Sequence, residues 1–82
     1  MVYPNPATDH ITVEFELDSI DLVSVELFDL FGKPIQSWPV SRFTGGIHRL
    51  RLQLRQYPQG IYLLRLQTSR ATETRKIMLS SE

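Results

Sequence analysis

Apolar and polar residues alternate over four stretches of this chain, and a period of two residues is typical of strands with one buried face. The alternation is regular in His10–Leu17 and returns in Leu22–Leu30, Ile47–Leu54 and Thr74–Leu79. The side chains predicted to face the core are Ile11, Val13, Phe15, Leu17, Val23, Val25, Leu27, Leu50, Leu52, Leu54, Ile77 and Leu79. No stretch has the apolar spacing of an amphipathic helix, so the pattern predicts an all-β protein.

The stretch Gly60–Gln67 differs from these four because it is apolar on both sides. Ile61 and Leu63 fall on one side of a strand, and the other side carries Tyr62, Leu64 and Leu66. Such a strand is expected to be buried on both faces and to lie at the centre of the fold. It follows a turn signal at residues 58–60, in which Gly60 can take a positive φ.

Proline, glycine and aspartate mark the connections between strands. Pro4 and Pro6 predict a stiff turn after a short edge strand at Val2–Tyr3. The segment Asp29–Lys33 predicts a hairpin in which Gly32 takes left-handed geometry. We expect a turn at Asp18–Asp21, a short edge strand at Pro34–Trp38, a loop at Pro39–Gly46 and a polar turn at Thr68–Glu73.

About seven short strands, spaced roughly 8–12 residues apart, are typical of an immunoglobulin-like antiparallel β-sandwich. In that strand order the second strand, His10–Leu17, pairs with the fifth, Ile47–Leu54. We therefore expect Glu14 and Glu16 to lie opposite two arginines, Arg49 and Arg51.

The length of 82 residues allows one domain with a modest core. The chain has no cysteine, which excludes disulfides and cysteine-based metal or redox sites. The longest apolar run, Ile61–Leu64, is too short for a membrane span, and Met1–Pro4 does not begin a signal peptide. We expect residues 1–82 to be a single domain and a fragment of a larger protein.

The net charge is zero, but acids and bases are segregated along the chain. Seven acidic residues and one lysine precede Ser41, whereas eight basic and two acidic residues follow Val40. Pairing of an acidic strand with a basic strand accounts for this pattern, because the charges alternate with core positions. The alternative is a basic face for an anionic partner. Since no basic run is present, we expect no nucleic-acid partner.

The sequence offers no catalytic arrangement. Asp9 and His10 are neighbours at an expected strand, so their side chains should point to opposite sides and form no relay. His48 lies on the apolar side of its strand and is expected to be structural. Asp18 and Asp21 could bind calcium with nearby carbonyls, but aspartates in turns more commonly accept backbone hydrogen bonds. We expect no catalytic residue, no metal and no cofactor.

Four aromatic residues remain to be explained. Trp38, Phe43 and Tyr57 lie at strand ends or in loops, where they would either form a platform for sugar rings or cap the open ends of a sandwich. Tyr62 stands two residues after Gly60 at the start of the central strand. This placement is typical of a tyrosine corner, in which the phenol donates a hydrogen bond to the backbone just upstream.

Three stretches occur in a characteristic order: Tyr3-Pro4-Asn5-Pro6-Ala7-Thr8-Asp9, then Val25–Lys33 with its Asp-x-x-Gly-Lys turn, then Tyr57–Leu66 with a terminal Lys76–Leu79. Together they resemble the C-terminal sorting domain of proteins exported by the type IX secretion system of Bacteroidetes. The resemblance spans nearly the whole chain. It implies a seven-stranded sandwich that acts as a secretion signal and not as an enzyme.

The resemblance also implies partners and sites. Such a domain follows a cargo protein, passes from the periplasm through the type IX translocon to the cell surface or the medium, and is removed by a sortase-like peptidase. Translocon recognition is implied for the last strand, at Lys76, Ile77, Met78 and Leu79. The structural motif residues are Tyr3, Pro4, Asn5, Pro6, Gly32, Gly60 and Tyr62.

A terminal strand at a sheet edge would offer unpaired backbone groups that a receptor could extend by strand addition. Lys76 would supply a charge, and Ile77 and Leu79 would fill pockets unless the core takes them. The residues Ser80–Glu82 that follow depart from the apolar or basic end of many members. The alternatives are an adhesive or spacer module of fibronectin type III kind and a glycan-binding module.

Overall fold

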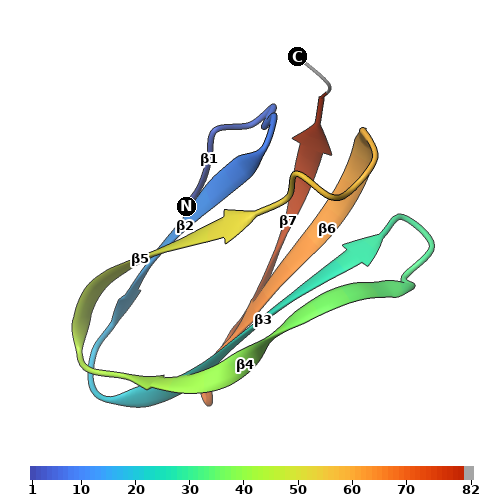
Figure 1. The fold of residues 1–82 in the computed structure, drawn as a ribbon. Helices are drawn as coiled ribbons and strands as arrows, with labels where there is room; N and C mark the ends of the chain where they lie inside the picture. The colour runs from blue at the N-terminus through green and yellow to red at the C-terminus, as the bar shows by residue number, and fades with distance from the viewer. Residues whose placement is uncertain (81–82) are drawn as a thin grey trace.

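Two antiparallel sheets face each other (Figure 1). Apolar side chains from both sheets pack between them as one cluster. A computed structural model describes residues 1–80, and this range contains seven strands and no helix. The strands are β1 (Val2–Tyr3), β2 (His10–Leu17), β3 (Asp21–Asp29), β4 (Pro34–Phe43), β5 (Gly46–Gln53), β6 (Gly60–Gln67) and β7 (Thr72–Leu79). The predicted all-β sandwich is confirmed, and residues 1–80 hold no helix that could cross a membrane.

The three-stranded sheet has the order β1-β2-β5, and the four-stranded sheet has the order β4-β3-β6-β7. The predicted pairing of the second strand with the fifth is confirmed, with Glu14 opposite Arg49. Arg49 Nε donates to Glu14 Oε1 at 3.0 Å. The expectation that both acids lie opposite arginines is wrong, because Glu16 lies opposite Ile47 and Arg51 lies opposite Thr12. Both acids could face arginines only in a register shifted by two residues, with Glu14 opposite Arg51 and Glu16 opposite Arg49, and the β2–β5 ladder does not adopt that register.

The core follows the predicted alternation. Every side chain expected to point inward is buried except Leu50, which is half-buried against the same cluster. The buried side chains are Ala7, Ile11, Val13, Phe15, Leu17, Val23, Val25, Leu27, Leu52, Leu54, Tyr62, Leu64, Ile77 and Leu79. Both sheets contribute to one cluster, so apolar burial between the layers is the main force that holds them together.

The expectation that β6 is buried on both faces is wrong. Tyr62 and Leu64 are buried between the sheets, but Ile61 is 36% exposed and Leu63 is half-buried. A two-layer sandwich has no third layer to cover the outer face of the sheet. The apolar residues on that face therefore remain at the surface.

The expected loop at Pro39–Gly46 is also wrong, because β4 continues to Phe43. The β3–β4 register shifts between Val23 opposite Ser41 and Val25 opposite Trp38, which leaves one extra residue on β4. Such a bulge accommodates Pro39 within an edge strand. The edge position predicted for this strand is confirmed. Asp21, expected in a turn, begins β3.

The hairpin between β3 and β4 has the geometry predicted for it. Gly32 has a φ of 83°, where a side chain would be strained. The carboxylate of Asp29 organises the turn, since its Oδ1 accepts from Phe31 N at 2.8 Å and from Lys33 N at 2.9 Å. Gly60 also has a positive φ, of 155°, at the start of β6.

Candidate functional site

The last strand, β7, forms one edge of the four-stranded sheet and pairs with β6 (Figure 1). Its side chains alternate between two environments. Ile77 is fully buried and Leu79 is 3% exposed, so both belong to the core. Lys76 and Met78 point outward, and Met78 is 48% exposed. Within the expected recognition segment, only Lys76 and Met78 present their side chains to a partner of the folded domain.

Asn5 lies against the free edge of this strand. Its Nδ2 donates to Lys76 O at 3.0 Å, and its Oδ1 accepts from Met78 N at 2.9 Å. The side-chain amide thus supplies one donor and one acceptor, as the peptide group of a neighbouring strand would. The two contacts cross 71 and 73 positions of the sequence.

The backbone of Ala7 also pairs with the free edge of β7. Ala7 N donates to Met78 O at 2.8 Å, and Ser80 N donates to Ala7 O at 2.7 Å. The methyl group of Ala7 is fully buried, so this short parallel bridge to Leu79 is anchored in the core. The expectation of an open terminal edge is therefore wrong for the half from Lys76 to Ser80. Edges covered in this way are protected from unwanted strand pairing.

The other residues of the Tyr3–Pro6 motif border the contact between Asn5 and β7. Pro4 and Pro6 flank Asn5, and the peptide bond before each of them is cis. Proline carries no backbone N–H, so neither residue adds a donor that would need a partner here. Tyr3 belongs to β1 and donates through its hydroxyl to Glu14 Oε1 at 3.3 Å. The motif joins β1 of one sheet to β7 of the other.

The outer face beside β7 is partly apolar. The register sets Phe28, Leu63 and Lys76 in one row across three strands, and Ile61 lies opposite Met78. The guanidinium of Arg65 stacks on the Phe28 ring at 4.7 Å from its centroid. Such a cation–π contact stabilises an exposed site by about 0.5–1 kcal/mol.

Tyr62 forms the predicted tyrosine corner. Its hydroxyl donates to Pro58 O at 2.5 Å, four residues upstream. Burial raises the pKa of this phenol, and the carboxylate of Asp29 and the phenol of Tyr57 act in the same direction. This hydrogen bond ties the connection between β5 and β6 to the start of β6.

The two histidines occupy different settings. The expectation that Asp9 and His10 point apart is wrong, because His10 Nδ1 lies 2.8 Å from Asp9 Oδ1. Asp9 precedes β2 and is not bound by strand alternation. The bond to His10 lowers the pKa of Asp9, with Arg55 contributing. His48 packs between Phe15 and Phe43 and contacts Thr44 O at 2.7 Å through Nε2, which fits the structural role expected for it.

Of the two aspartates considered for calcium, Asp18 and Asp21, the second is engaged by protein donors. Asp21 Oδ1 accepts from Leu22 N at 2.7 Å, and Oδ2 accepts from the hydroxyl of Ser69 at 2.9 Å. The bond from Ser69 lowers the pKa of this carboxyl, with the Leu22 amide contributing. Across residues 1–80, no three His, Cys, Asp or Glu side chains gather closely enough to hold a metal ion.

The remaining aromatic candidates pack against the core. Trp38, Phe43 and Tyr57 are each partly buried on it. Phe43 meets the Phe15 ring edge-on at 5.3 Å, and Tyr57 lies 6.4 Å from the Tyr62 ring. These contacts favour the capping interpretation over a sugar platform.

Sequence reasoning missed the cover on β7. It assigned Asn5 and its prolines to a structural motif but did not predict their contact with the last strand. It gave Ala7 no role. The sequence held one signal for this contact: Ala7 is a single small apolar residue directly after Pro6 and before two polar residues. Ser81 and Glu82, which belong to the stretch that departs from the end of many members, lie outside the described residues.

The family model described as "Secretion system C-terminal sorting domain" matches residues 1–80. The chain therefore belongs to the family of type IX secretion C-terminal sorting domains, as its three stretches predicted. No curated protein and no solved structure matches it significantly. Membership of this family supports a role as a C-terminal sorting signal that follows a cargo protein and interacts with the type IX secretion machinery. It also implies export to the cell surface or the extracellular space, in Bacteroidetes.

Proposed function

We propose that this domain is the address by which the type IX translocon selects a cargo protein in the periplasm and exports it across the outer membrane. A sortase-like peptidase then separates the cargo from the domain. The folded domain takes part in recognition and no residue acts as a catalyst. The single observation that carries the proposal is the match to the sorting-domain family over residues 1–80.

The recognition surface is the outward side of β7. Lys76 supplies a positive charge, and Met78 supplies an adaptable apolar contact beside Ile61. Ile77 and Leu79 act from within, since their burial fixes the strand that carries the two exposed side chains. In this arrangement the four residues form one unit with two contacting members and two anchoring members.

Strand addition by a receptor meets a restriction at this edge. Outward backbone groups alternate along a strand, and those of Met78 together with Lys76 O are engaged by the segment from Asn5 to Ala7. A receptor strand would therefore pair along the half from Thr72 to Arg75, or would first displace Asn5. A receptor that contacts only the side chains of Lys76 and Met78 needs neither to pair with the backbone of β7 nor to displace Asn5.

The proposal is tested by replacing the charge on β7 and comparing it with a matched site. The chain has two lysines, Lys76 and Lys33, and both are exposed. Lys76→Glu and Lys33→Glu are placed in a reporter that carries a Sec signal and ends in residues 1–82, in a type IX-competent host. We expect Lys76→Glu to reduce export at least several-fold and Lys33→Glu to leave it near the parent level.

The comparison is valid only for folded proteins, so each purified domain is first shown to melt as the parent does. Equal export of the two folded variants would contradict recognition through Lys76. Met78→Ser is the second probe of the same surface, because it removes the apolar contact without touching the core. The mass of the released reporter shows whether a peptidase has cut upstream of the domain.

A further inference from the structure

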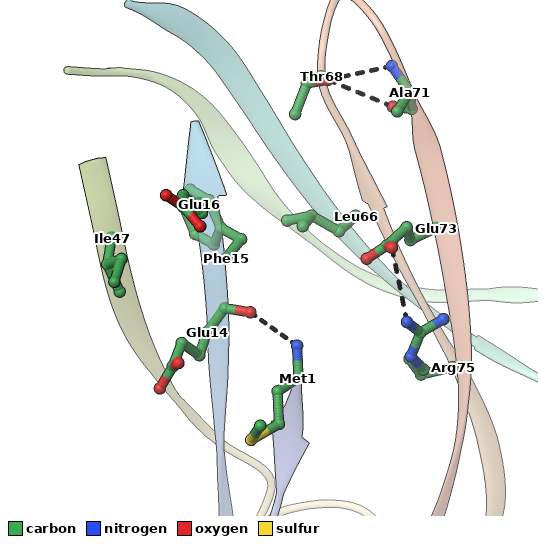
Figure 2. A pocket seen from close by; sticks show the side chains of 10 residues that line it. All are labelled: Met1, Glu14, Phe15, Glu16, Ile47, Leu66, Thr68, Ala71, Glu73 and Arg75. Carbon is green, nitrogen blue, oxygen red and sulfur yellow. Dashed lines mark hydrogen bonds and ion pairs between the residues drawn. The ribbon is translucent and has the colours of Figure 1, made fainter. Parts of the chain in front are cut away.

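The sandwich has an opening between the edges of its two sheets on each of two sides. Figure 2 shows the opening beside β1 and β7, which is lined by Glu14 of β2 and by Glu73 and Arg75 of β7. The arginine there is already paired, because Arg75 Nη2 lies 3.5 Å from Glu73 Oε2. The second opening has a volume of about 250 Å³ and is lined by residues of β4 and β5 together with β3.

The lining of the β4–β5 opening is mostly apolar. Val23, Val25 and Leu52 line it and belong to the buried core. Leu50 of β5 and Trp38 of β4 also line it and are only partly buried against that core. An apolar side chain that entered this opening would leave water and would make contacts that the lining atoms now lack.

Strand β5 has a partner strand on one side only, because it ends the order β1-β2-β5. Glu14 exchanges two backbone hydrogen bonds with the residue opposite it on the β1 side, so the backbone groups of Val13 point the other way, to β5. Leu50, which lies opposite Val13, therefore turns its N–H and C=O toward β2. Arg49 and Arg51 turn theirs to the free edge, where an added strand can pair with them.

The edge of β4 on the other side of the opening is less suited to pairing. Pro39 lies within this strand and has no N–H to donate. The register shift between Val23 and Val25 leaves an extra residue on β4 at the same place. Proline and bulges both protect an edge against strand addition. An extended segment that covers the opening would therefore pair with β5.

The charges on β5 indicate which kind of segment fits. Arg49 and Arg51 are exposed on the outer face of the sheet, whereas Leu50 between them faces the core. Arg49 Nε donates to Glu14 on the neighbouring strand β2. Arg51 lies opposite Thr12 and forms no ion pair within residues 1–80. An acidic side chain next to β5 would supply the missing partner.

We propose that the free edge of β5 binds an extended segment of a partner protein in which apolar and acidic residues alternate. Its backbone pairs with Arg49 and Arg51, its apolar side chains enter the opening beside Trp38, and its carboxylates lie next to Arg51 on the outer face. Strand β2 is the precedent within this chain, because it presents apolar residues to the core and Glu14 to Arg49. The site lies on a different strand from Lys76 and Met78 and does not depend on the proposed function.

A second copy of this chain is a poorer occupant of the same edge. Two β5 strands paired antiparallel about Leu50 would set Arg49 of each copy opposite Arg51 of the other. Like charges directly opposite each other destabilise a ladder. The charge of the edge thus favours an acidic strand over another β5.

The probe is a synthetic peptide with the sequence of residues 10–17, blocked at both ends, whose two glutamates alternate with apolar residues. Trp38 is the only tryptophan of the chain, so its fluorescence reports on the opening. We expect the peptide to shift Trp38 emission to shorter wavelength, in a saturable way, and to reduce its quenching by acrylamide at least about twofold. The same peptide with both glutamates replaced by lysine should bind about tenfold more weakly or not at all.

Charge reversal in the domain tests the role assigned to Arg51. Arg51→Glu should weaken the glutamate peptide about tenfold or more and should strengthen the lysine peptide. The matched control is Arg70→Glu, which makes the same change of charge at an exposed arginine in the turn between β6 and β7. It should leave the affinity for the glutamate peptide within about twofold of the parent.

Amide hydrogen exchange shows where the peptide pairs. Bound peptide should slow exchange at Arg49 and Arg51 about tenfold or more, while Leu50, whose N–H faces β2, exchanges no faster than before. Faster exchange at Leu50 would mean that the peptide displaces β2 and would overturn the inference. Equal binding of the two peptides, or equal effects of Arg51→Glu and Arg70→Glu, would overturn it as well. A Trp38 shift that grows with protein concentration in the absence of peptide would assign the opening to a second copy instead.

Discussion

Replacing Asn5 by alanine removes one side chain that bridges the two ends of the sequence. The amide is exposed, yet both of its polar atoms are engaged, with Lys76 O at 3.0 Å and Met78 N at 2.9 Å. Alanine keeps the backbone path and loses both bonds. The variant therefore isolates the contribution of this cover to the edge of β7.

The magnitude follows from the two bonds. A neutral hydrogen bond contributes about 0.5–1.5 kcal/mol, and water can replace part of each in an exposed site. We expect the free energy of unfolding to fall by about 1–2 kcal/mol. In a domain of this length a loss of 1 kcal/mol lowers the melting temperature by roughly 4–8 °C. Local opening at Met78 should become about tenfold more frequent, since 1.4 kcal/mol corresponds to a factor of ten.

Urea unfolding gives the global value, and amide exchange at Met78 gives the local one. Asn5→Asp is an informative companion, because a carboxylate still accepts from Met78 N but cannot donate to Lys76 O at neutral pH. It should fall to or below the stability of the alanine variant, since its charge faces a carbonyl oxygen. Thr8→Ala, at an exposed position of the same connection, is the control and should change little.

The reasoning would be refuted if Asn5→Ala left both the unfolding free energy and the Met78 exchange rate at parent values. A lower stability with unchanged exchange at Met78 would also count against it, because the loss would then arise away from the β7 edge.

Three further predictions test other parts of the fold. Tyr62→Phe deletes the hydroxyl bonded to Pro58 O and should cost about 1–2 kcal/mol in urea unfolding, whereas an unchanged midpoint would exclude a stabilising corner. Ile77→Ala empties a fully buried site and should cost about 2–5 kcal/mol; a cost under 1 kcal/mol would place this residue outside the core. Asp21 has a lowered pKa, mainly through its bond from Ser69, so the stability it adds is present above its ordinary value of 3.8 and is lost as pH falls through the lowered folded value. Asp21→Asn should therefore melt with a shallower pH dependence between about pH 5 and pH 2, and parallel curves would contradict this linkage.

Much of the sandwich is predictable because its strands obey a local rule. Alternation alone identified the inward side of β2, β3, β5 and β7, since a two-layer fold buries one side of each strand. The same rule failed for β6. Its outer apolar residues, Ile61 and Leu63, suggested two covered faces, but a two-layer architecture leaves that side at the surface.

The contacts that define the β7 edge could not be predicted in this way. Asn5 and Met78 are 73 positions apart, and neither belongs to a pattern that refers to the other. Likewise the bond between Asp9 and His10 depends on where β2 begins, and a shift of one residue at a strand boundary reverses the expected side. Such features depend on the assembled topology and not on local periodicity.

The central claim is that this domain is an export address, and the most direct measurement is the location of a reporter. A folded reporter with a Sec signal and residues 1–82 at its C-terminus is expressed in a type IX-competent strain and in the same strain without the translocon. We predict reporter at the cell surface or in the medium of the first strain, and reporter confined to the periplasm in the second. Equal distribution in both strains, or retention in the periplasm of both, would contradict the account.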